Sequence, residues 1–260
     1  MTSFNELVPL HSIDHSQEEL LSIKRNDLVP LLSDQSKLNY YADHIVQAQM
    51  ALLNGIDAQL IQKMSETISN IIQQLNSSKK KFRQRKFNAL QKWLGLDLEF
   101  NAEKIHHHQD LAQLIHQADQ LAQRLKIETQ KSQARVKQVE GLREQMAKYI
   151  FAAKDFLKDY PQFAVNRHPL DNFNERLSKK IHTLETLQAS NDIVLMQMQL
   201  TQQLSLTLID RFSEAQQILI PAWQYHLEQS QQRNTSSDLE QLDRSREKLI
   251  RTLKQSLKKE

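Results

Sequence analysis

A run of basic residues is the first feature of this sequence that could do chemistry. It consists of Lys79, Lys80, Lys81, Arg83, Arg85 and Lys86, with Phe82 and Phe87 in the same stretch and no acidic residue. Such a run could contact an anionic membrane, where each basic residue contributes about 1 kcal/mol, or a phosphate backbone. The alternative, which we favour, is a solvated helix face whose two phenylalanines pack inward.

A second candidate is the tract His106, His107 and His108, since histidine is a common metal ligand. Successive residues of a helix point about 100 degrees apart, so three in a row cannot converge on one ion. Acidic neighbours complete only pairs, such as Glu103 with His107. We therefore predict a solvated tract, with neither a metal site nor a cofactor.

The remaining candidates lie in the second half of the chain. His182 is close to Lys180, and the two side chains could bind an oxyanion, although a polar contact between helices is the favoured alternative. Pro221 must kink or restart a helix, because it lacks an amide hydrogen and its ring clashes with the preceding turn. Beside that kink, Trp223 either wedges a third helix against its neighbours, which we favour, or anchors a protein partner.

Composition excludes several functional classes. The 260 residues include no cysteine, which rules out thiolate zinc sites, disulfides and thiol reduction of a substrate by this chain. The sequence also lacks a glycine-rich phosphate loop, a nucleophile elbow and a metalloprotease motif, so we predict that the protein is not an enzyme. Its 34 basic and 31 acidic residues nearly balance, which argues against a general nucleic-acid-binding surface.

Long helices must position these residues. Only 39% of the residues are hydrophobic, and three glycines and five prolines allow few turns. Apolar residues recur in steps of three and four from about Leu98 to Asp159 and again from Asp171 to Ser230. Two rods of similar length joined by a short loop fold back on each other. The predicted fold class is all-α, an elongated helical bundle with a long antiparallel coiled-coil-like hairpin.

The pattern divides the chain into four segments. Residues 1–35 form an N-terminal arm and a short helix that starts after Ser16, and residues 36–95 form a small helical hairpin, with helices from Ser36 and Asp57, followed by the basic segment. Residues 96–230 form the long hairpin, in which Gly141 costs about 1 kcal/mol relative to alanine without breaking the helix. Residues 231–260 form a linker and a C-terminal helix. Polar seam residues such as Gln188 could close within one chain or between two, which leaves a homo-oligomer open.

Several short segments, taken in order, carry a family resemblance. They are Asn174 to Glu185, which contains Lys-Ile-His-Thr-Leu-Glu, then Met196 to Met198, Gln202–Gln203, and Ile-Pro-Ala-Trp from Ile220 to Trp223. This order resembles the central region of the toxic anion resistance family, the TelA/KlaA-type tellurite resistance proteins. The resemblance covers about Ala89 to Ser230. Ala222 stands where that family usually has leucine, and the helical tail after the tryptophan is shorter here.

The resemblance implies a biological role more than a reaction. It implies a non-enzymatic cytoplasmic helical scaffold that acts in resistance to tellurite or to cell-envelope stress through contacts with other stress-resistance proteins or with an anionic membrane surface. The amino terminus lacks the features of a signal peptide, and no window approaches the about 20 apolar residues of a membrane span, so we expect a cytoplasmic protein that could lie against the inner membrane face. The alternative is a coiled-coil module that binds membranes or nucleic acid through residues 79–86, with nucleic acid the less favoured partner.

Overall fold

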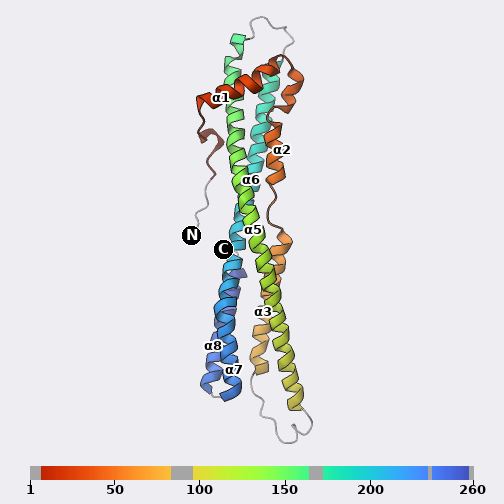
Figure 1. Ribbon diagram of the computed structural model, residues 1–260, viewed down its shortest axis with the longest axis vertical. Coiled ribbons are helices and arrows are strands. Elements are labelled where there is room, and N and C mark those ends of the chain that lie inside the picture. The colour runs from red at the N-terminus through yellow and green to blue at the C-terminus, as the bar shows by residue number, and fades with distance from the viewer. Residues whose placement is uncertain (1–6, 83–95, 164–171, 234–235, 258–260) are drawn as a thin grey trace. The chain divides into compact units, whose positions relative to one another are not determined.

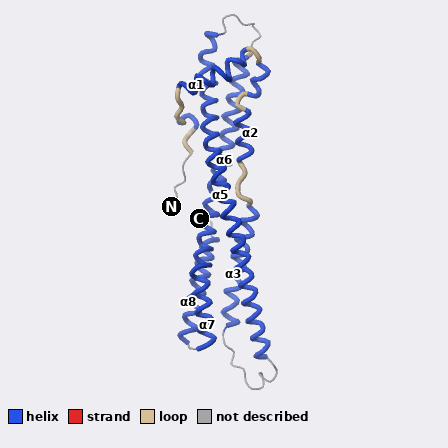
Figure 2. The backbone as a smooth tube through the Cα atoms, in the orientation of Figure 1, coloured by secondary structure: helices blue, strands red, loops and turns tan. Residues whose placement is uncertain are grey.

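The computed structural model describes residues 7–82, 96–163, 172–233 and 236–257 (Figure 1). These residues form helices and loops, with no strand among them, which confirms the predicted all-α bundle (Figure 2). The α-helices are α1 (Gln17–Ile23), α2 (Asp43–Leu52), α3 (Ala58–Phe82), α5 (Leu96–Phe163), α6 (Phe173–Glu214), α7 (Ile220–Arg233) and α8 (Ser236–Leu257). Shorter helical turns are η1 (Leu10–Ser12), η2 (Lys24–Leu28), η3 (Val29–Leu32), η4 (Gln35–Tyr40) and η5 (Ala215–Leu219).

The two longest helices, α5 and α6, are consecutive in the chain and pack together as an antiparallel pair. The predicted first rod ended at Asp159, whereas α5 continues through Pro161 to Phe163. A proline removes one amide donor, and this loss is tolerated in the last turn of a helix that is already packed along its length. Gly141 lies inside α5 on an exposed face, as the apolar spacing on both sides of it predicted.

The interruption predicted at Pro221 is present, but it is not a loop. The chain passes from α6 through the π-helical turn η5 directly into α7, and the amide of Ile220 donates a hydrogen bond to the carbonyl of Ala215, five residues earlier. A π-helical turn is wider than an α-helical one and gives the proline ring room beside the preceding carbonyls. The helix therefore accommodates Pro221 without a break.

The chain forms two compact units, and each contains parts of both α5 and α6. The first unit consists of Met1–Gly55 and Ser132–Leu200, and the second of Ile56–Lys131 and Thr201–Glu260. As a result, α2 contributes to the core of the first unit and α3 to that of the second. Each unit is built from segments that lie far apart in the sequence.

The core of the first unit lies where the N-terminal helices cover α5 and α6. In this unit α2 lies alongside α6 (Figure 1). Phe156 of α5 and Phe173 of α6 meet edge to face, with ring centroids 6.3 Å apart. The other buried apolar residues of this cluster include Leu28, Leu31, Leu38, Tyr41, Ile45, Met146, Ile150, Ala153, Leu177, Ile181 and Leu184.

A connected polar network crosses the same unit and joins three helices. The side-chain amide of Gln49 in α2 donates to Gln188 of α6 at 2.8 Å, and Asn191 donates to Gln49 at 2.9 Å. Gln188 in turn donates to Asp192 at 2.7 Å, and Arg143 of α5 holds both oxygens of that carboxylate, at 2.8 and 3.0 Å. Gln188, a predicted seam residue, is thus buried within one chain. The network fixes the register of α2, α5 and α6 relative to one another, because a shift of any one helix along its axis would separate these hydrogen-bonding partners.

The core of the second unit is one large apolar cluster. Here α8 packs against α7 and α3, and buries Leu242, Leu249, Ile250 and Leu253. The buried residues of this core include Met64, Ile68, Ile71, Leu75, Leu111, Ala118, Leu125, Phe212, Leu219, Trp223, Leu227, Leu249 and Leu253. In this unit the side-chain amide of Gln216 in η5 donates a hydrogen bond to Asp119 of α5 at 2.8 Å.

Two predicted helix boundaries are wrong. The helix expected from Ser36 begins at Asp43, because Ala42 has a left-handed backbone with φ of 62° and interrupts it. That conformation costs roughly 1 to 2 kcal/mol in a residue with a side chain. Burial of Leu38, Tyr41 and Ala42, together with a hydrogen bond of 2.8 Å from the Tyr41 hydroxyl to the Tyr149 carbonyl, offsets the cost. The helix from Asp57, expected to be followed by the basic segment, instead continues into that segment and ends at Phe82.

Candidate functional site

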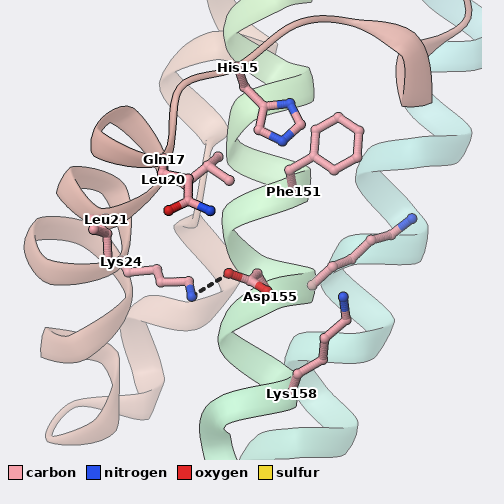
Figure 3. Close-up of a pocket in the computed structure, with 9 residues that line it drawn as sticks. His15, Gln17, Leu20, Leu21, Lys24, Phe151, Asp155 and Lys158 are labelled. Atoms are coloured by element: carbon pink, nitrogen blue, oxygen red, sulfur yellow. Dashed lines mark hydrogen bonds and ion pairs between the residues drawn. The ribbon is translucent and has the colours of Figure 1, made fainter.

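A pocket of about 650 Å³ lies in the first unit between α1 and α5 (Figure 3). Two helix faces with the same spacing, i, i+3, i+4 and i+7, line it, because residues at these intervals share one side of a helix. From α1 and the start of η2 come Gln17, Leu20, Leu21 and Lys24, from α5 come Phe151, Lys154, Asp155 and Lys158, and His15 comes from the segment before α1. The pocket therefore combines apolar side chains with ammonium groups.

One end of the pocket is formed by two rings. His15 stacks on Phe151, with ring centroids 4.4 Å apart and an interplanar angle of 24°. The Nδ1 of His15 lies 3.0 Å from the carbonyl oxygen of Ile13, and since a carbonyl only accepts, Nδ1 carries the hydrogen. This hydrogen bond orients the His15 ring through Nδ1 and does not involve the other ring nitrogen, Nε2. Figure 3 shows the two rings at one end of the pocket and Lys158 at the other.

Across the pocket, Lys24 joins α1 to α5. Its ammonium lies 2.5 Å from Asp155 and 2.9 Å from Asp159, and the Lys24 side chain is 13% exposed. Burial alone would lower the pKa of Lys24, but hydrogen bonds to Asp155 and Asp159 outweigh it and raise the pKa above its usual value. Lys24 therefore stays charged, and the carboxylates of Asp155 and Asp159 are both engaged in ion pairs within the protein.

A capping box orders the start of α1, and a further ion pair holds that start against α5. Ser16 and Glu19 form a capping box, in which each side chain accepts a hydrogen bond from the other residue's backbone amide. Glu19 also accepts a bond of 2.5 Å from Lys148 of α5. The bonds from Lys148 and from the Ser16 amide lower the pKa of Glu19 to about 2. The start of α1, and with it one wall of the pocket, is thus fixed by one carboxylate.

The structure places Lys180 and His182 in different environments. Lys180 donates to the backbone carbonyl of Asn39 at 2.5 Å and pairs with Asp43 at 2.7 Å, so its ammonium holds the start of α2 against α6. His182 lies on α6 with an exposed side chain. The bonds of Lys180 direct its charge away from the oxyanion site that the spacing of these two residues suggested.

Pro221 and Trp223 belong to the second unit. Pro221 is exposed at the first turn of α7, whereas Trp223 is 2% exposed within the apolar core. A side chain buried to this degree serves packing inside the chain, and as placed here it presents no surface to a partner.

Much of the basic run lies outside the described residues. Lys79, Lys80 and Lys81 belong to the last turns of α3, but nothing is described of their side chains, and Arg83, Arg85 and Lys86 fall in the stretch 83–95 that the structure does not describe. The side chains of His106, His107 and His108 also lie outside the described part. Among side chains that are described, no group of three or more His, Asp or Glu residues could hold a metal ion.

The pocket residues were not among the candidates found in the sequence. The spacing of Leu20, Leu21 and Lys24 on one helix face is visible in the sequence, and so is the Ser16–Glu19 cap. The sequence does not show that this face meets α5, because Lys24 and Asp155 are 131 residues apart. The signal available in the sequence was a pair of helix faces with the same spacing of lining residues, one carrying Lys24 and the other Asp155.

The comparisons with known proteins found one relative. The chain is similar to Protein KlaA from Escherichia coli. The two are 26% identical over 178 residues, which is 67% of this chain and 69% of that protein. No family model matches the chain, and no solved structure matches it. Within the described part of the chain, every helix is too short or too polar to cross a membrane. The similarity supports a distant relation to the KlaA-type proteins that the motifs of α6 and α7 resemble.

Proposed function

We propose that this protein is a non-enzymatic helical scaffold of the toxic anion resistance type, which acts in resistance to tellurite or cell-envelope stress. The observation that carries the proposal is the similarity to Protein KlaA over 178 residues. It agrees with the order of motifs from Asn174 to Trp223, which resembles the family that bears the KlaA name. The alignment and the motif order, both read from the sequence, thus support the same role.

The packing of the motif residues supports a scaffold rather than a catalyst. Leu177, Ile181 and Leu184 are buried, and Lys180 is held by Asn39 and Asp43. A residue that belongs to a core or to a bridge between helices is occupied by the fold and has no free group to offer a substrate. We propose that the motif preserves this helical arrangement.

We further propose that the scaffold works in the cytoplasm, through protein partners or through an anionic lipid surface at the inner membrane face. The basic run from Lys79 to Lys86 supports the membrane contact, since six cations near anionic lipids contribute about 1 kcal/mol each. The near balance of charge over the whole chain supports a local contact of this kind over general binding to nucleic acid.

The test is a gene deletion with complementation. The deletion strain should become sensitive to tellurite or to envelope-acting compounds, and the wild-type gene should restore resistance. A variant with the six basic residues of the run changed to glutamine should restore less. The matched control changes six exposed basic residues elsewhere, namely Arg124, Lys126, Lys137, Lys248, Arg251 and Lys254. Unchanged sensitivity in the deletion strain would contradict the resistance role, whereas equal rescue by both variants would contradict only the membrane contact.

A further inference from the structure

We propose that the pocket between α1 and α5 binds a small amphipathic anion, that is, an apolar body carrying one phosphate or carboxylate group. The inference goes beyond the resistance role, because it rests on the geometry of this pocket alone. Among the described residues, the motif residues of α6 do not line the pocket.

The size of the pocket suits such a ligand. At about 650 Å³ it falls inside the range of roughly 300 to 1,000 Å³ that small-molecule sites occupy. It lies between two helices that Lys24 and Lys148 tie together through Asp155 and Glu19. These ties form within the protein, so the walls are in place before a ligand arrives, which lowers the cost of binding.

Apolar side chains provide a surface for the ligand body. Leu20 and Leu21 of α1 face the pocket with Phe151 of α5, and His15 extends the surface by stacking on Phe151. Leu21 is 61% exposed although it lines the pocket, so part of its apolar surface remains in contact with water. A ligand that covers Leu21 gains roughly 25 cal/mol for each Å² of apolar surface removed from water.

The charges of the pocket select an anion. Asp155, the one carboxylate in the lining, is engaged by Lys24, and Asp159 holds the same ammonium from outside the lining. Lys154 pairs with Glu185 at 2.6 Å, but both side chains are substantially exposed, at 48% and 37%, and such pairs are weak. Lys158 has an exposed side chain one turn further along the same face of α5. Lys154 and Lys158 can therefore both turn to an anionic group.

Binding of octyl phosphate by the whole protein tests the proposal. Titration calorimetry at low salt should show binding of this probe, and binding of octyltrimethylammonium, with the same chain and the opposite charge, should be at least about tenfold weaker. Both probes are used as dispersed monomers, so that micelles do not contribute. Equal affinity for the two probes, or no binding of octyl phosphate, would overturn the proposal.

Two surface variants locate the site without disturbing a core. Lys158→Gln and Leu21→Gln should each weaken binding of octyl phosphate about fivefold, since each removes one exposed contact. The matched controls are Lys137→Gln, an exposed lysine of the same helix, and Leu200→Gln, which is 46% exposed in the same unit; both should bind as the wild type does. Equal weakening in pocket and control variants would place binding elsewhere and refute the assignment.

Vesicles of phosphatidylcholine with phosphatidylglycerol distinguish the source of the anion. If the site takes a lipid, Lys158→Gln should reduce co-sedimentation with these vesicles as well as binding of octyl phosphate. If it takes a soluble metabolite, the variant should affect octyl phosphate alone. Both results support an amphipathic anion, and a variant that alters neither measurement refutes it.

Discussion

The two compact units differ in how they use charged side chains. In the first unit, most ion pairs join different helical elements: Lys24 with Asp155 and Asp159, Lys148 with Glu19, Lys154 with Glu185, Lys180 with Asp43, and Arg143 with Asp192. Two others, Lys37 with Asp34 and Lys179 with Glu175, are local. In the second unit, the ion pairs between described residues stay within one helix: Lys131 with Glu128, Arg211 with Glu214, Arg244 with Glu240, and Arg246 with Asp243. One unit is positioned by directional contacts and the other by apolar packing.

Helix length explains why ion pairs hold the short helices of the first unit, whereas Arg143 with Asp192 and Lys154 with Glu185 join the two long helices α5 and α6. In the first unit, α1 has 7 residues and α2 has 10, which is below the roughly 12 to 15 residues that an isolated helix needs even for marginal stability. Such short elements expose few apolar side chains, and specific polar partners must fix them on α5 and α6. In the second unit, α3 has 25 residues and α8 has 22, so each presents a long apolar stripe that defines its own position. The pocket occurs in the unit whose elements are joined by charges.

The largest expected effect is a loss of stability in the second unit, caused by a substitution in its apolar core. Trp223→Ala should lower the free energy of unfolding by about 4 kcal/mol, because it leaves a cavity in the core where Trp223 is 2% exposed. Denaturant unfolding followed by circular dichroism measures this change. Tyr225→Ala, on the same helix with 59% exposure, is the control and should change stability by less than about 0.5 kcal/mol. A small effect of Trp223→Ala would show that this unit does not depend on its core.

The next effect tests the polar network of the first unit. Arg143→Met should lower the free energy of unfolding by about 3 kcal/mol, because it leaves the Asp192 carboxylate, only 18% exposed, without its ion-pair partner. Lys131→Met in the second unit breaks an exposed pair and should cost less than about 1 kcal/mol. Adding Asp192→Leu to Arg143→Met should recover much of the loss, since the unpaired charge is then removed. Similar losses in the two single variants would contradict the contrast between the units.

The long helices could be predicted from the sequence, whereas the features that depend on distant contacts could not. Apolar residues at steps of three and four define α5 and α6, because these helices pack together over much of their length. The helix start at Ser16 was also predictable, since its cap involves residues three apart. In contrast, the left-handed Ala42 is stabilised by the contact of Tyr41 with Tyr149, 108 residues away.

The same reasoning applies to the candidate site. A pattern on one helix shows which side chains share a face, but it does not identify the face opposite. Lys180 illustrates the limit, because its spacing with His182 left open an anion site or, as favoured, a polar contact between helices, and it did not identify Asn39 and Asp43, the partners of its ammonium more than one hundred residues earlier. In the first unit, the contacts that a lysine makes within the protein therefore have to be known before a ligand-binding role is proposed for it.

A smaller effect raises stability without touching either polar or apolar contacts. Gly141→Ala should increase the free energy of unfolding by about 1 kcal/mol, because alanine restricts the unfolded chain and favours the helix. The position is exposed in α5, and an added Cβ would meet no heavy atom within 4 Å. Denaturant unfolding should show a higher midpoint with an unchanged slope. A loss of stability would mean that α5 is strained at this residue.

The smallest effect follows the charge that fixes α1. The pKa of Glu19 is lowered from 4.5 to about 2 when the protein is folded, so the folded state favours the ionised carboxylate. The stability that Glu19 contributes is therefore fully present above about pH 4.5 and is lost as the pH falls from 4.5 toward 2. Glu19→Gln should be less stable than the wild type at pH 7, and the difference should shrink between pH 4.5 and pH 3 in urea unfolding. In a Lys148→Met background most of this pH dependence should disappear, since the bond from Lys148 is the largest cause of the shift. If it persists there, the Ser16 cap and not the bridge to α5 holds the carboxylate, and the first unit depends less on its charges between helices than the comparison of the two units implies.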